Sequence, residues 1–319
     1  MKVWRSLAEV AADPLPAPYI TVGTFDGVHL GHRALLRELQ EMARAGRGAA
    51  VVVTFDPPPD PLAEPEGTRR LSYPHERLDQ LAAAGVEAVL TLPFDDALRS
   101  MAADQFVEEV LVGALHARGV CVGHDHHFGH DGHGDISLLS LLGKKYGFET
   151  HAAPPFAVDG MIVSSTLIRR KLREGDVAAA NKYLGYRYEV WGTVEAGSGL
   201  ASRELGYPTA NVKVEAKMLP APGVYVALGD IFEEEGRRGE GPFGAFLNLG
   251  FRPTFAEEPA GAPGLEVHLF DFARDILGRR VRVQFVARLR DEVKFEGAEE
   301  LREQLIEDEK KARRILFSH

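Results

Sequence analysis

The apolar residues in the first half of the chain alternate between two spacings. Short apolar runs rich in β-branched residues predict buried strands at 19–23, 49–55, 86–92 and 120–123. Between or after them, apolar residues that recur every three or four positions predict helices at 34–45, 74–84 and 104–117. This strand–helix order is typical of an α/β fold, in which helices cover a parallel sheet and ligands bind at the carboxyl ends of the strands.

The pattern changes after about residue 185. Strands follow one another without helices and with Gly and Pro between them, at 187–195, 223–229, 243–249, 265–272 and 281–289. Such a series predicts an antiparallel β-barrel. A charged amphipathic segment at 298–316 predicts a closing helix, and 233–239 predicts a solvated hairpin tip. We therefore expect two domains, 1–184 and 185–319, divided just after a helix over 176–183.

Composition narrows the class of protein. The 319 residues are 45% hydrophobic and 26% charged, which is ordinary for a globular protein, and the net charge of −10 disfavours nucleic acid as the main partner. The single cysteine, Cys121, excludes an internal disulfide and a multi-cysteine zinc site, fits a reducing cytosol, and lies in an apolar run that predicts a buried thiol. No window reaches the roughly 20 apolar residues of a membrane helix, and residues 1–10 lack the features of a signal peptide. We expect a cytoplasmic protein with small-molecule ligands and no membrane partner.

The segment 23–32, Gly-Thr-Phe-Asp-Gly-Val-His-Leu-Gly-His, places two histidines at a predicted helix start. Unpaired backbone N–H groups and the positive end of the helix dipole attract an anion there. His29 and His32 are three residues apart and so share a face, from which two imidazoles can stabilise the charge that develops during nucleotide transfer. His-x-Gly-His is typical of nucleotidyltransferases, which attack a nucleoside triphosphate at its α-phosphate. The candidate binding residues of this segment are Gly23, Phe25, Asp26 and Gly31.

Two further segments are expected at the same crevice. Asp56 follows a predicted strand and precedes three prolines, so it either ends the strand in a turn or binds a metal or the substrate. Five histidines crowd the segment 124–133 without regular ligand spacing. A glycine-rich loop that brings Asp125 to a base or ribose is therefore favoured over a zinc site.

A serine-rich segment, Val-Ser-Ser-Thr-Leu-Ile-Arg, begins at residue 163. Ser164 or Ser165 can cap a helix whose first turn carries Thr166 and Arg169. Hydroxyls and a guanidinium at a helix start are suited to a triphosphate, although capped helices are common without one.

The second half carries a Gly-rich turn that leads into Leu-Gly-Tyr-Pro-Thr-Ala-Asn. Gly197 and Gly199 allow backbone N–H groups to close on phosphates. Thr209 and Asn211, directly after Pro208, are two residues apart and would share one face of a strand. Their oxygen atoms are hard donors suited to Mg²⁺.

The segments of the α/β half, in this order and spacing, resemble the adenylyltransferase module of the prokaryotic bifunctional riboflavin kinase/FMN adenylyltransferase (FAD synthetase) family. The resemblance implies a Rossmann-like nucleotidyltransferase domain that transfers AMP from ATP to FMN and releases pyrophosphate. It implies that His29 and His32 contact the ATP phosphates, and that ATP is held by Asp125, Ser164, Thr166 and Arg169.

The barrel half resembles the riboflavin kinase of the same family through Leu-Gly-(aromatic)-Pro-Thr-Ala-Asn and the segments 248–254 and 265–272. This resemblance implies ATP-dependent phosphorylation of riboflavin to FMN. Glu266 would be the general base for the 5′-hydroxyl, while Thr209 and Asn211 would hold Mg²⁺ at the transferring phosphate. The segment 289–295 would close over the flavin.

The chain departs from the family pattern at three positions. His126 stands where an aromatic residue is usual, Pro58 where a histidine is frequent, and Ser202 where many relatives have glycine. Two other functions stay open on the residues alone: a nucleotidyltransferase with another acceptor, and a flavin-binding or regulatory protein with reduced catalytic activity.

Overall fold

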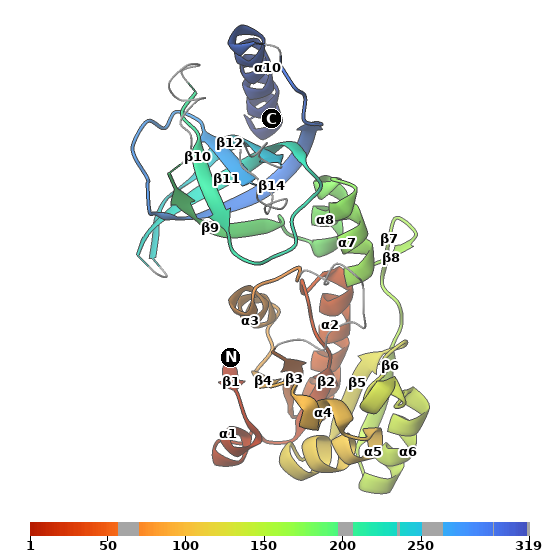
Figure 1. The fold of residues 1–319 in the computed structure, drawn as a ribbon. Coiled ribbons are helices and arrows are strands. Elements are labelled where there is room, and N and C mark those ends of the chain that lie inside the picture. The colour runs from red at the N-terminus through yellow and green to blue at the C-terminus, as the bar shows by residue number, and fades with distance from the viewer. Residues whose placement is uncertain (57–69, 197–206, 235–236, 251–263, 296, 318–319) are drawn as a thin grey trace. The chain divides into compact units, whose positions relative to one another are not determined.

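The computed structural model describes residues 1–319 except 57–69, 197–206, 235–236, 251–263, 296 and 318–319. The chain folds as two compact units, Met1–Ser165 and Thr166–His319 (Figure 1).

The first unit is built on a six-stranded sheet with the order β1-β4-β3-β2-β5-β6. All five neighbouring pairs are parallel, as the alternating pattern predicts. The strands are β1 (Lys2–Trp4), β2 (Pro18–Val22), β3 (Ala49–Phe55), β4 (Ala88–Leu92), β5 (Gly119–Gly123) and β6 (Glu149–Ala153). Every residue of β2 and of β3 is buried, because helices cover both faces of a parallel sheet.

Helices connect these strands and complete two apolar layers. They are α1 (Leu7–Ala12), α2 (Leu30–Ala45), α3 (Pro74–Ala83), α4 (Asp96–Ser100), α5 (Ala103–Phe106) and α6 (Ile136–Tyr146), with a π-helical segment at Val107–Ala114 and a 3₁₀ turn at His130–Gly132. One core cluster includes Leu36 and Leu39 of α2 together with Val52 and Cys121 of the sheet. A second includes Phe106 and Leu111. A small hairpin, β7 (Ala157–Val158) and β8 (Met161–Ile162), precedes the second unit.

The second unit is a closed antiparallel barrel with the strand order β10-β13-β12-β11-β14-β9. Its strands are β9 (Glu189–Glu195), β10 (Ala210–Val214), β11 (Gly223–Glu234), β12 (Arg237–Gly250), β13 (Gly264–Leu269) and β14 (Arg280–Arg290). Helices α7 (Ser165–Arg173) and α8 (Val177–Leu184) precede the barrel, and α10 (Ala298–Phe317) packs against β11, β12 and β14. The sequence-based prediction of a barrel with a closing helix is confirmed.

Several predicted boundaries differ from the structure. Strand β11 extends to Glu234 and β12 begins at Arg237, so most of the hairpin tip predicted over 233–239 belongs to these two strands. Helix α2 begins at Leu30 rather than at residue 34, because the histidine-bearing turn is itself helical. The segment predicted as one helix over 104–117 is instead α5 followed by the π-helical Val107–Ala114. Strand β13 ends at Leu269, and the chain turns at Asp271, whose φ is 57°. The two residues between β11 and β12, in the predicted hairpin tip, lie outside the described residues.

The pattern did not predict the two edge strands of the sheet or the helices α1 and α6. Over the described residues, no helix is both long enough and apolar enough to span a bilayer.

Candidate active sites

The two histidines of the first unit lie together at the start of α2. His29 is the N-cap residue, and its Nδ1 accepts the backbone N–H of His32 at 3.2 Å. The two imidazole rings stack, with centroids 3.6 Å apart and an angle of 15° between their planes. Because Nδ1 of His29 is an acceptor, its neutral ring carries the proton on Nε2, which can then donate to an anion.

The loop before α2 holds this pair through an unusual backbone. Phe25, Gly27 and Val28 have φ angles of 49°, 81° and 32°, a region that a β-branched residue rarely adopts. Phe25 and Val28 are almost fully buried, so packing maintains the conformation. The ring of Phe25 lies 5.0 Å from that of His32, and a Cβ on Gly23 would approach the Phe25 ring to 3.2 Å.

Asp26 anchors this loop to the segment before α3. Its buried carboxylate accepts the backbone N–H groups of Leu71 and Ser72, both at 3.0 Å, and the Ser72 hydroxyl at 3.1 Å. The same hydroxyl accepts the N–H of Gly27 at 3.0 Å. Arg77, also buried, donates to the carbonyl of Thr24 at 3.3 Å. Burial lowers the pKa of Arg77, and the carboxylates of Asp56 and Asp26 oppose that shift.

Gly31 permits a close approach between α2 and the residues before α7. A Cβ at Gly31 would lie 2.9 Å from the carbonyl oxygen of Val163 and 3.1 Å from the His29 ring. Nearby, the hydroxyl of Ser165 donates to the carbonyl of Asp26 at 2.9 Å. The structure therefore brings the serine segment to the histidine loop within the first unit. Ser164 is partly buried just before α7, while Thr166 and Arg169 lie on α7 in the second unit.

The histidine-rich loop follows β5. Asp125 is largely exposed, and its carbonyl lies 3.0 Å from Nδ1 of His127. The ring of His126 lies nearly parallel to that of Phe128, with centroids 5.8 Å apart. Burial lowers the pKa of His126 to about 4, with a smaller lowering from His127 and an opposing effect of Asp125. His126 is therefore neutral at physiological pH.

A pocket of about 330 Å³ lies where β2 and β3 end. Its lining includes the aromatic side chains Phe55, Phe94, Phe106, His126 and Phe128, aliphatic residues, and the charged Arg99 and Asp131. Aromatic and aliphatic side chains together with a few polar groups are typical of a pocket for an aromatic ligand. Asp56, at the end of β3, pairs with Arg70 at 3.5 Å, and the choice between a turn and a binding role for this residue stays a prediction.

In the barrel, three polar residues lie side by side on adjacent strands. Glu266 of β13 pairs in register with Asn211 of β10 on one side and with Asn248 of β12 on the other. Residues directly opposite on neighbouring strands share a face, with Cβ atoms about 4.5–5.5 Å apart. Thr209 directly precedes β10, and the carbonyl of Pro208 lies 2.8 Å from Nδ1 of His268.

Two pockets meet at Thr209. One, of about 250 Å³, is also lined by Asn248, Glu266 and the apolar side chains Phe246, Phe295, Leu301 and Leu305. The other, of about 410 Å³, is lined by Pro208, Asn211 and the segment 272–277. The structure thus brings Thr209, Asn211 and Glu266 to one place. Gly197 and Gly199 lie outside the described residues.

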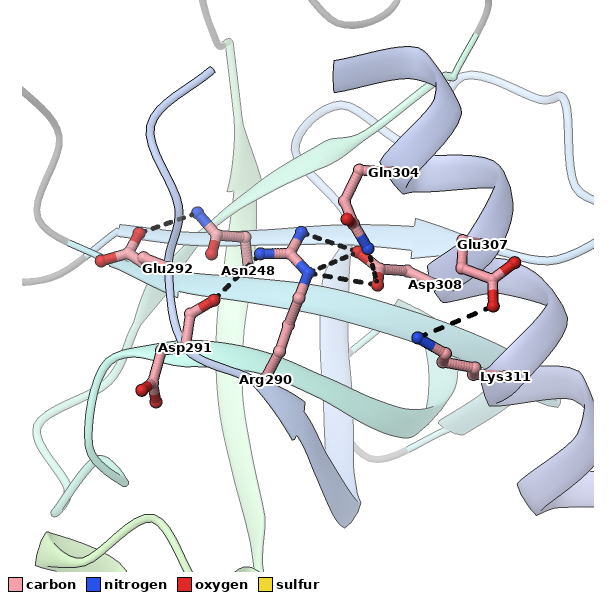
Figure 2. A network of polar contacts seen from close by, with 8 residues as sticks. All are labelled: Asn248, Arg290, Asp291, Glu292, Gln304, Glu307, Asp308 and Lys311. Carbon is pink, nitrogen blue, oxygen red and sulfur yellow. Dashed lines mark hydrogen bonds and ion pairs between the residues drawn. The ribbon is translucent and has the colours of Figure 1, made fainter. Parts of the chain in front are cut away.

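An ion pair joins the barrel to α10 (Figure 2), and both of its residues line the smaller pocket. Arg290 donates from Nε and Nη2 to the carboxylate of Asp308, with contacts of 2.7–3.1 Å. Gln304 donates to the same carboxylate at 2.9 Å, and Asp308 is almost fully buried. Two other residues that line this pocket are also joined, since Asn248 donates to Glu292 at 3.2 Å.

Sequence reasoning missed several of these contacts. Ser72, Arg77 and Asp308 stand in no motif, because each acts on a residue far away in the sequence. The residues around Ser72 form no recognisable motif, so the local sequence does not indicate that Ser72 binds Asp26. The only sequence signal for a buried ion pair at Asp308 is that this acidic residue lies on the apolar face of the last helix.

The fold and the sites define a class of protein with a nucleotide-binding α/β unit followed by a β-barrel that has a pocket of its own. Two family models match in the same order: FAD synthetase over residues 13–167 and riboflavin kinase over residues 184–316. The chain belongs to the bifunctional riboflavin kinase/FMN adenylyltransferase family.

Curated relatives cover nearly the whole chain. A bifunctional riboflavin kinase/FMN adenylyltransferase of Escherichia coli K12 is 36% identical over 316 residues, which are 98% of this chain and 97% of the relative. One from Pseudomonas fluorescens is 39% identical and covers 92% of each chain. A crystal structure from Streptococcus pneumoniae, titled a macrolide-efflux protein, is 31% identical with a TM-score of 0.80, covering 93% of this chain and 94% of that one.

Proposed function

We propose that this chain catalyses two successive ATP-dependent reactions. The barrel phosphorylates riboflavin to FMN, and the α/β unit transfers AMP from ATP to FMN, forming FAD and pyrophosphate. The observation that carries the proposal is the presence of two polar clusters in one chain: the stacked His29 and His32 at a helix start, and the Asn211–Glu266–Asn248 row in the barrel. Both reactions consume ATP, which supports the expectation of a cytoplasmic location.

In the α/β unit, the phosphate of FMN attacks the α-phosphorus of ATP, and the bond to pyrophosphate breaks. Nε2–H of His29 donates to the phosphate oxygens, whose charge increases in the transition state, and His32 stacks beside it. The helix start supplies backbone N–H groups to the same anion. Gly23, Phe25, Asp26 and Gly31 stay proposed binding residues of this loop, and the buried Asp26 carboxylate also holds the loop in place through Ser72.

The remaining ATP contacts are proposals from the family pattern. Ser164, Thr166 and Arg169 would hold the phosphates, and Asp125 the base or ribose. The exposure of the Asp125 carboxylate supports its availability to a ligand.

The aromatic pocket at the ends of β2 and β3 is the proposed seat of the isoalloxazine ring of FMN. Its neutral His126 is parallel to Phe128 and can present an aromatic face to the flavin. The departure from the usual aromatic residue at this position would then preserve the stacking surface.

In the barrel, the two pockets that meet at Thr209 suggest how the substrates are divided. The smaller pocket, with apolar walls and Glu266, would hold riboflavin, and the larger one ATP. Glu266 would take the proton of the 5′-hydroxyl as this oxygen attacks the γ-phosphorus and the bond to ADP breaks. The Gly-rich segment with Gly197 and Gly199 would contact the phosphates.

The donor set at the pocket junction fits Mg²⁺. Thr209 and Asn211 supply a hydroxyl and an amide oxygen, both hard ligands, beside the carboxylate of Glu266. We propose that Thr209 and Asn211 hold the ion, which neutralises phosphate charge when bound.

The experiment is incubation of the purified chain with riboflavin, ATP and Mg²⁺, followed by chromatographic separation of FMN and FAD. Both products are expected in sequence. FMN without FAD would refute the adenylyltransferase, and flavin binding without turnover would favour the regulatory alternative. Supplying other phosphate-bearing acceptors tests the remaining alternative.

Glu266→Gln separates the two activities. Loss of the general base should lower FMN formation by about 10²-fold or more, while supplied FMN is still converted to FAD. If a folded variant lost both activities, or kept its kinase rate, the assignment of Glu266 would be wrong.

The domain boundary at Leu184–Gly185 is also retained as a proposal, with 1–184 as the adenylyltransferase and 185–319 as the kinase. The compact units divide earlier, between Ser165 and Thr166, so α8, which ends at Leu184, folds with the barrel although the family pattern divides the two activities after it.

A further inference from the structure

The face of the sheet beneath α2 carries a cluster of metal-ligating side chains that neither proposed active site uses. Cys121 of β5 and His151 of β6 are register partners on parallel strands, so their side chains lie side by side on one face. Glu38 reaches them from α2, which covers that face. The ligand atoms of the three side chains all lie within 4.8 Å of one another.

We propose that Glu38, Cys121 and His151 form a binding site for a zinc-like divalent transition-metal ion. Thiolate, imidazole and carboxylate are the three ligand types that Zn²⁺ takes in proteins, and three protein ligands leave the fourth position to water. Among the residues that the structure describes, this is the one group of three such side chains close enough to share an ion. The five histidines of the loop over 124–133 form no such group within the described part of the chain.

Small movements would bring the three ligand atoms, now all within 4.8 Å of one another, to the spacing of a tetrahedral site. Ligand atoms around Zn²⁺ lie about 3.3–3.6 Å apart, from metal–ligand bonds of about 2.0–2.3 Å. Nε2 of His151 and Oε2 of Glu38 now form a hydrogen bond of 2.5 Å. These two atoms would therefore separate by about 1 Å as the ion replaces the hydrogen bond. Their side chains are 44% and 30% exposed, which leaves room for this movement and a path for the ion.

The charges and the softness of the donors favour zinc over magnesium or calcium. A thiolate and a carboxylate together balance a divalent cation, and imidazole adds a neutral nitrogen. One sulfur and one nitrogen among three ligands do not suit cations that require oxygen.

The thiol itself must change on binding. Cys121 is fully buried, and desolvation, with a smaller contribution from Glu38, raises its pKa to about 12. Without metal it is therefore a protonated, unreactive thiol. When the sulfur–metal bond forms, the S–H proton is released to solvent.

A bound ion would join three elements that are distant in the sequence. Glu38 lies on the helix that begins with the histidine pair, while Cys121 and His151 belong to the two strands at one edge of the sheet. The site would thus fix α2 to the sheet without touching either proposed substrate pocket.

The test is Co²⁺ binding to the reduced, metal-free full-length protein, followed by absorbance. A thiolate-to-cobalt charge-transfer band in the near ultraviolet can report only Cys121, because the chain has a single cysteine. The band should appear on titration, disappear in Cys121→Ser, and be bleached by Zn²⁺. Affinity should fall at least about tenfold in His151→Gln and in Glu38→Gln, the usual scale for loss of a metal-site residue.

Two matched variants serve as controls. Glu41→Gln removes an exposed carboxylate of the same helix, and His133→Gln removes an exposed histidine of the loop. Both should bind Co²⁺ like the unchanged protein. Absence of the band in the unchanged protein, or unchanged affinity in both His151→Gln and Glu38→Gln, would overturn the site.

A second readout covers the case in which Cys121→Ser does not fold. A hundredfold excess of Zn²⁺ over its dissociation constant should raise the melting temperature of the unchanged protein by about 5–10 °C. The same addition to His151→Gln should raise it much less. An equal rise in both proteins would contradict a site that contains His151.

Discussion

Arg290 of β14 holds both carboxylate oxygens of Asp308 of α10 through two of its nitrogens, at distances of 2.7–3.1 Å. The carboxylate is almost completely buried, and Gln304 donates to it as well (Figure 2). The barrel and its closing helix are therefore joined by a desolvated ion pair at the wall of the proposed riboflavin pocket.

Asp308→Ala should leave the Arg290 guanidinium buried without its countercharge. Removal of one partner of a buried pair costs about 3–5 kcal/mol, so the free energy of unfolding of the barrel should fall by that amount in urea titrations. FMN formation should decline with it, while conversion of supplied FMN to FAD persists. Glu307→Gln is the control, because the neighbouring pair Glu307–Lys311 is exposed at 3.7 Å and should contribute at most about 1 kcal/mol. Equal losses in both variants would contradict a special role for Asp308.

His29 caps helix α2 and is also proposed to bind the ATP phosphates through its ring, and one substitution can separate these two roles. Asparagine is a good N-cap residue, so His29→Asn should change the free energy of unfolding by less than about 1 kcal/mol. Without the imidazole, FAD formation from FMN and ATP should fall by about 10²-fold or more. Riboflavin phosphorylation in the same sample is the internal control. A variant that retains normal FAD formation would show that the cap, not the ring, is the contribution of His29.

His126 should make the stability of the α/β unit depend on pH. Its pKa is lowered to about 4 in the folded state, from the ordinary histidine value near 6.5 in the unfolded chain. Between these values the unfolded state binds one more proton than the folded state. The free energy of unfolding should therefore decrease as pH falls from 6.5 to 4, and below pH 4 His126 should lower it no further. His126→Phe should remove this part of the slope in denaturant titrations at several pH values. A slope unchanged in His126→Phe would assign it to other groups.

The second compact unit includes α8, and its packing predicts where a stable kinase fragment begins. Asn181 donates to the carbonyl of Phe285 on β14 at 2.8 Å and accepts the N–H of Tyr188 at 2.7 Å. Val177 and Leu184 of the same helix are fully buried. A fragment 176–319 should therefore exceed 185–319 in free energy of unfolding by at least about 3 kcal/mol. Equal stability of the two fragments would favour the boundary at Leu184–Gly185.

The sequence predicted the main architecture because most of its elements carry strong periodic signals. The uninterrupted apolar run of β3 and the helical spacing in α2 are two examples. Strand β6 was missed because it is a largely exposed edge strand, in which only Ala153 is buried. The π-helical segment 107–114 was read as ordinary helix, since the two conformations share a similar apolar pattern over so short a length.

The sequence predicted some contacts of the candidate sites and missed others. Motif spacing placed His29 beside His32, because the two residues lie within one helical turn. The proximity of Thr209 to Glu266 was implied only by the family resemblance, because no local spacing links residues so far apart in the sequence. The roles of these residues stay predictions. The anchor of Asp26 on Ser72 depends on tertiary folding between segments 46 residues apart, and no local pattern encodes it.

The ion pair with α10 also has a consequence for synthesis on the ribosome. All six strands of the α/β sheet are translated before residue 154, so that unit can assemble while the barrel is still incomplete. Arg290 emerges before its partner Asp308, and until the helix docks, the guanidinium has no carboxylate to enclose it. In a nascent chain, the α/β unit could therefore fold well before the barrel pocket proposed for riboflavin is complete.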